Sequence, residues 1–102
     1  MKVYNKLVRD KIPDIIKSNG ETANCRVLNN DEYLKELNTK IKEEVFEYLE
    51  SGQIEELADI EEVIRAILDA KMVSYEHFEK IRLNKVQKRG AFKNKIFLET
   101  TE

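Results

Sequence analysis

Two short acidic stretches decide the fold of this chain: KEEVFE at residues 42–47 and EELAD at residues 55–59. On a helix of about 100° per residue, the first stretch belongs to a segment whose apolar side chains form one stripe. The members of that stripe are Leu34, Leu37, Ile41, Val45 and Tyr48. Glu44 falls inside the stripe, Glu47 lies at its edge, and Glu43 points further outward.

The second stretch opens another helical segment that also turns acids toward its apolar side. Its stripe consists of Ile60, Val63, Ile64 and Ile67. Glu56 lies in line with that stripe and Asp59 lies at its border. The i, i+3 spacing places Glu44 with Glu47, and Glu56 with Asp59, on one face of each helix.

Carboxylates on the inner faces of two successive helices are costly to bury unless they converge on a cation. Hard divalent ions take oxygen ligands, so four such acids on antiparallel helices are typical of a Mg²⁺ site, with Mn²⁺ as the substitute. The alternative is a pair of charged helices covered by surface salt bridges. A chain with 37% charged residues leaves both interpretations open.

The remaining periodicity predicts a mainly α fold in a single domain, residues 1–102. We expect an antiparallel bundle of three longer helices at about 31–50, 54–70 and 75–89, preceded by a short N-terminal helix ending near residue 17. Residues 22–28 and 95–99 alternate weakly and predict a small two-stranded β ribbon. Three helices of this length leave one side of the second uncovered, so completion of the bundle in a homodimer, or a dimer of dimers, is expected.

Composition restricts the class of protein. The formal net charge of −2 gives no basic signature for nucleic acid, and no partner of that class is expected. No apolar run reaches the ~20 residues of a membrane span, and lysines interrupt the N-terminus where a signal peptide would be apolar. The one cysteine, Cys25, cannot form an internal disulfide, which favours the cytoplasm, and it is expected to fill space in the core.

Two groups of basic residues accompany the acids. One lies in the N-terminal segment: Lys6, Arg9 and Lys11. The other lies on the last helix, largely on one face: Arg82, Lys85, Lys88 and Arg89. Ordinary surface charge and the dipole at a helix C-terminus explain such bases without a ligand. Acids for a metal together with bases for phosphate are, however, what a phosphoryl-transfer site requires.

The acidic motif resembles that of the MazG-like all-α nucleoside triphosphate pyrophosphohydrolases, in which Glu-Glu-x-x-Glu is followed by Glu-x-x-Asp. Here the two halves stand at residues 43–47 and 56–59. The opening YNKLVRDKIP, residues 4–13, and the closing KRGAF, residues 88–92, resemble one small branch, the phosphoribosyl-ATP pyrophosphohydrolase-like, house-cleaning subgroup. The spacer between the motif halves is eight residues, shorter than in many members of the superfamily.

The resemblance implies a hydrolase that splits a nucleoside triphosphate, expected to carry a modified base, into nucleoside monophosphate and pyrophosphate. It implies Mg²⁺ held by Glu44, Glu47, Glu56 and Asp59. Glu43 would be the catalytic residue that orients or deprotonates water, although a supporting role behind the metal ligands is equally open. The two basic groups would bind phosphate. The competing hypothesis is a non-catalytic helical interaction or regulatory module built on the same scaffold.

Overall fold

The computed structural model describes all of residues 1–102 and is entirely helical. Its four helices are α1 (Ile12–Ser18), α2 (Asn30–Ser51), α3 (Ile54–Ala70) and α4 (Tyr75–Arg89). The chain divides into two compact units, Met1–Met72 and Val73–Glu102. The prediction of a mainly α chain with three longer helices and a short N-terminal one is confirmed. The joining of those helices in one bundle, and in one domain, stays a prediction.

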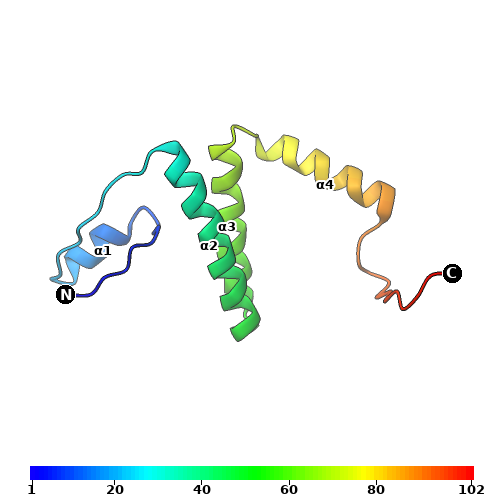
Figure 1. Ribbon diagram of the computed structural model, residues 1–102, viewed down its shortest axis with the longest axis horizontal. Coiled ribbons are helices and arrows are strands. Elements are labelled where there is room, and N and C mark those ends of the chain that lie inside the picture. The colour runs from blue at the N-terminus through cyan, green and yellow to red at the C-terminus, as the bar shows by residue number, and fades with distance from the viewer. The chain divides into compact units, whose positions relative to one another are not determined.

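The first unit is built on an antiparallel hairpin of α2 and α3, which lie side by side (Figure 1). Asn29 begins α2 by accepting a hydrogen bond from the Glu32 backbone N–H at 2.9 Å. Gly52 ends it at φ 67°, in the left-handed region that glycine adopts without steric cost, and its N–H donates to the Tyr48 carbonyl at 2.7 Å. This tight turn makes α3 the immediate neighbour of α2.

The core of this unit is small. Leu37 of α2 and Val63 of α3 are its buried apolar side chains, and most of the expected stripe residues around them are half-buried. Glu44 is buried as well, in agreement with its place inside the stripe of α2. The hairpin therefore encloses a carboxylate almost as completely as it encloses its hydrophobic centre.

In the second unit, Ser74 caps α4 by accepting a hydrogen bond from the His77 N–H at 3.1 Å. Gly90, at φ 84°, ends the helix as expected. Tyr75 and Phe78 place their rings 6.0 Å apart near its start. No helix in the structure has the length and apolar character needed to cross a membrane.

The two-stranded ribbon expected from residues 22–28 and 95–99 is not observed, because both segments are irregular. Val27, Ile96 and Phe97 are almost fully exposed and pack against nothing that would hold a strand in place. An isolated pair of short strands is marginally stable in water, so the weak alternation in these segments is not sufficient to form one. Cys25, expected in the core, is also exposed.

Candidate metal centre

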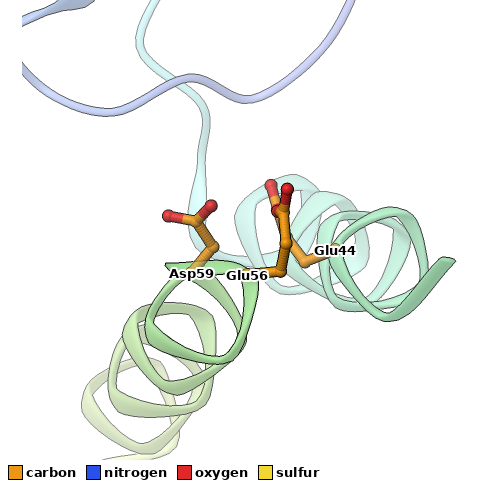
Figure 2. A group of neighbouring side chains, drawn as sticks. All are labelled: Glu44, Glu56 and Asp59. Atoms are coloured by element: carbon orange, nitrogen blue, oxygen red, sulfur yellow. The ribbon is translucent and has the colours of Figure 1, made fainter. Parts of the chain in front are cut away.

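Three acids from the α2–α3 hairpin meet at one point. Glu44 comes from α2, while Glu56 and Asp59 come from the first two turns of α3. One carboxylate oxygen from each lies within 4.8 Å of the others, and the three groups turn toward the same side of the hairpin (Figure 2). The i, i+3 spacing on α3 and the short turn at Gly52 bring them together.

Glu44 is the distinctive member of this group. Its residue is 6% exposed, and its Oε2 atom is buried without any hydrogen-bond partner. An unpaired buried carboxylate oxygen costs free energy of about 1–3 kcal/mol or more. The open oxygen is therefore available to a proton, a water molecule or a cation.

The environment of Glu44 opposes its negative charge. Burial raises the pKa of the Glu44 carboxyl above its ordinary value, the neighbouring Glu47 carboxylate raises it further, and Lys40 partly offsets both effects. The Lys40 ammonium lies 3.4 Å from Glu44 Oε1 and 3.5 Å from Glu43 Oε1. A single lysine thus serves two carboxylates, and the acids retain an excess of negative charge.

The other two acids of the motif lie around this centre. Glu47 stands close enough to Glu44 to affect its pKa, but it is exposed and lies outside the group of three converging oxygens. Glu43 points outward from the buried face, as expected, and is held by Lys40 and by Lys6, whose Nζ lies 3.8 Å from Glu43 Oε1. Three of the four predicted ligands therefore converge in the structure.

The N-terminal segment brings two of its bases into contact with the acids, and phosphate binding by these bases stays a prediction. The Arg9 guanidinium donates from Nη2 to Asp59 Oδ1 at 2.7 Å, and Lys6 reaches Glu43. Lys11, the residue before α1, is exposed and forms no ion pair. Two of the three bases in this segment thus contact the motif directly, across 37 to 50 residues of sequence.

The bases of α4 belong to the second unit. Arg82 donates from Nε to both carboxylate oxygens of Glu79, at 3.0 and 3.1 Å, and its Nη2 also binds that carboxylate. Lys85, Lys88 and Arg89 are exposed and form no ion pair. Their role toward phosphate stays a prediction.

Lys40 is the site residue that sequence reasoning missed. Its ammonium lies beside Glu43 and Glu44, and its side chain is 17% exposed. The i, i+3 and i, i+4 spacing from Lys40 to these acids carried the signal, because residues so spaced are neighbours on a helix. The donor set as a whole, carboxylate oxygens without sulfur or nitrogen ligands, fits a hard divalent cation such as Mg²⁺ or Mn²⁺.

Comparison with known proteins gives one match of limited extent. An uncharacterized protein from Mycolicibacterium smegmatis is 48% identical over 42 residues, which cover 41% of this chain and 43% of that protein. The match spans less than half the length of either chain. No family model and no solved structure matches the chain.

Proposed function

We propose that this chain is a metal-dependent nucleoside triphosphate pyrophosphohydrolase of the MazG-like superfamily, in its small phosphoribosyl-ATP pyrophosphohydrolase-like branch. The observation that carries the proposal is the buried Glu44 carboxylate, whose Oε2 has no protein partner and which converges with Glu56 and Asp59. Acids on an exposed helix need no ligand, but one buried with an open oxygen requires compensation.

Glu44, Glu56 and Asp59 would hold the ion, with Glu47 completing the set after a rotamer change. A divalent ion held there would polarise the phosphate oxygens and favour deprotonation of the attacking water. Around it, the N-terminal bases Lys6, Arg9 and Lys11 would neutralise the triphosphate. Phosphate binding by the bases of α4 is a separate prediction from the sequence.

In the reaction, water adds to a phosphorus atom of the α–β bridge and the bridging P–O bond breaks. The products are nucleoside monophosphate and pyrophosphate, and the proton of the water passes to a base. Glu43 is our candidate for that base or for orienting the water, because it borders the cluster while remaining one-third exposed. Glu43 forms ion pairs with Lys6 and Lys40, so a bound substrate would have to draw those ammonium groups away before Glu43 could act on water.

A second copy of the chain is proposed as the partner of the hairpin. Four apolar side chains flank the Gly52 turn in the open: Phe46, Leu49, Ile54 and Leu57. Phe46 is 62% exposed, and Leu49 and Ile54 are each 74% exposed. An exposed apolar group of this size, on a hairpin with so small a core, favours association through the same surface of a second copy, in a homodimer or a dimer of dimers.

The exposed Cys25 thiol is compatible with the cytoplasm, which we propose as the location.

The experiment that tests the reaction is an assay of pyrophosphate release over standard and modified-base nucleoside triphosphates. Each is incubated with the protein in Mg²⁺, Mn²⁺ or EDTA, and the nucleotide product is identified. We expect release that requires the metal, with monophosphate formed in equal amount and with modified bases preferred. Release of orthophosphate and a nucleoside diphosphate would contradict cleavage at the α–β bridge.

The second candidate function is a non-catalytic helical interaction module. The ion pairs from Arg9 to Asp59 and from Lys6 to Glu43 favour it, because acids that serve only as partners of surface bases would show the same contacts. The two functions differ in their response to metal. A ligand that binds only the folded state raises its stability, so the enzyme should gain thermal stability from Mg²⁺ or Mn²⁺ and the module should not.

A further inference from the structure

The N-terminal segment holds a cationic side chain against the acid cluster. Arg9 Nη2 lies 2.7 Å from Asp59 Oδ1, the shorter of the two contacts that join the N-terminal segment to the acids. Asp59 is one of the three converging acids, whereas Glu43, the partner of Lys6, is not. Of the two N-terminal bases, Arg9 is therefore the one that competes with an ion for a ligand of the cluster. Lys40 of α2 contacts another member, Glu44.

The segment that carries Arg9 is suited to release it. Residues 1–9 form no helix or strand, and most of their side chains are exposed. The Arg9 and Asp59 side chains are themselves 58% and 38% exposed, so their ion pair is hydrated and of modest strength. A segment with few buried contacts can shift at low cost in free energy.

A polyphosphate offers the guanidinium a replacement partner. Arginine binds phosphate through parallel N–H donors in the same way as it binds carboxylate. An ion that arrives alone removes Asp59 from Arg9 and leaves the guanidinium without an anionic partner. An ion that arrives with a polyphosphate provides both a charge for the acids and an anion for Arg9.

From this geometry we infer that Arg9 exchanges Asp59 for the substrate phosphates, and that this exchange makes the divalent cation and the polyphosphate bind cooperatively. The chain then binds the bare ion weakly and the ion–polyphosphate complex tightly. The inference rests on the proposed function, since it assumes that the acid cluster is the cation site. By linkage, the polyphosphate must increase the affinity of the protein for the ion by the same factor as the ion increases its affinity for the polyphosphate.

The test is a Mn²⁺ titration followed by electron paramagnetic resonance, which counts free Mn²⁺ and requires no turnover. Wild-type protein and Arg9→Gln are titrated with and without a nucleoside triphosphate whose α–β bridge is a non-hydrolysable methylene group. Free analogue binds Mn²⁺ itself, so its contribution is subtracted from a protein-free series. In wild type, the analogue should lower the dissociation constant of Mn²⁺ by about fivefold or more.

In Arg9→Gln, Mn²⁺ alone should bind a few-fold more tightly than in wild type. The factor by which the analogue increases the affinity for Mn²⁺ should be clearly smaller than in wild type, the remainder arising from direct contact between the ion and the phosphates. Lys17→Gln, an exposed change of the same charge in α1, should behave as wild type. Arg9→Lys keeps the charge without the planar fork and should retain only a fraction of the coupling. Circular dichroism establishes that each variant is folded, and Arg9→Lys replaces Arg9→Gln if the latter is not.

The possible outcomes distinguish the role of Arg9 from the proposal that the acid cluster binds a divalent cation. Equal Mn²⁺ affinity and equal coupling in wild type and Arg9→Gln would overturn the role of Arg9 while leaving the metal site intact. If wild type binds no Mn²⁺ with or without the analogue, the metal site itself is wrong, and the inference is overturned with it.

Discussion

At the scale of single residues, Glu44 combines two properties that oppose each other in a metal-free protein. Its position in the apolar stripe of α2 buries it, and its open Oε2 atom and the nearby Glu47 make its negative charge unfavourable there. Removing this charge should therefore raise the stability of the protein and lower its activity.

Glu44→Gln should stabilise the metal-free protein at neutral pH by about 1 kcal/mol, which is roughly 4–8 °C in Tm for a domain of this size. The pKa of Glu44 is raised in the folded state, mainly by burial, so folding binds a proton in the window between the unfolded and the folded value. The contribution of Glu44 to the free energy of unfolding is largest below its pKa in the unfolded state. That contribution is lost as the pH rises through its pKa in the folded state. Melting curves in EDTA from pH 4 to 8 should show the advantage of the variant growing with pH. An advantage that does not change with pH would contradict this account.

Glu56→Gln should lower metal-dependent turnover by about 100-fold or more, because a metal ion contributes several kcal/mol of charge stabilisation to such a reaction. It should also abolish the rise in Tm on adding Mn²⁺, while the fold is retained. Glu62→Gln is the matched control, since Glu62 is an exposed acid on the same helix outside the cluster. Full activity in Glu56→Gln would remove this residue from the ligand set.

At the scale of elements, the α2–α3 turn sets the separation of Glu44 from Glu56. Gly52→Ala should lower the free energy of unfolding by about 1–2 kcal/mol. The φ of 67° at this position lies in the left-handed region, where a residue with a Cβ is strained. A Cβ at this position would meet nothing within 4 Å, so the cost is conformational alone. Gly52→Asn should cost less, since asparagine tolerates this conformation. Urea unfolding in EDTA measures both, and a Gly52→Ala protein as stable as wild type would show that the turn is relaxed in solution.

Helices were predictable from the sequence at this scale because their signals are local. Asn29, Gly52, Ser74 and Gly90 end or begin elements through contacts within a few residues, and the apolar period of α2 placed Glu44 inward. The strands at 22–28 and 95–99 depended on a pairing partner, which no local pattern supplies, and they are not formed.

At the scale of the whole molecule, the contact between Arg9 and Asp59 spans 50 residues. The sequence predicted a basic segment that would bind phosphate, but its ion pairs with particular acids depend on how the N-terminal segment crosses the hairpin. Exposure of Cys25 and of the apolar residues near Gly52 is likewise a tertiary property. Helical periodicity shows which side of a helix is apolar, and it does not show which neighbour covers that side.

The apolar group beside Gly52 leads to a prediction about assembly. Sedimentation at micromolar concentration should show a dimer or a dimer of dimers, and Phe46→Glu should shift it toward monomer by placing a charge in the contact. Lys17→Glu, a more drastic change of charge at an exposed position of α1 outside the hairpin, is the control and should not alter assembly. A wild-type protein that sediments as a compact monomer would contradict the proposed partner.

The central claim is that Glu44, Glu56 and Asp59 form a divalent cation site. Anomalous diffraction from crystals grown with Mn²⁺ and the methylene nucleotide analogue tests it most directly, because the Mn²⁺ signal locates the ion without reference to activity. We predict a peak at about 2.0–2.3 Å from oxygens of these three carboxylates, with the Arg9 guanidinium moved from Asp59 to phosphate. Crystals that contain the analogue but show no anomalous peak at the cluster, with Arg9 still bound to Asp59, would contradict it.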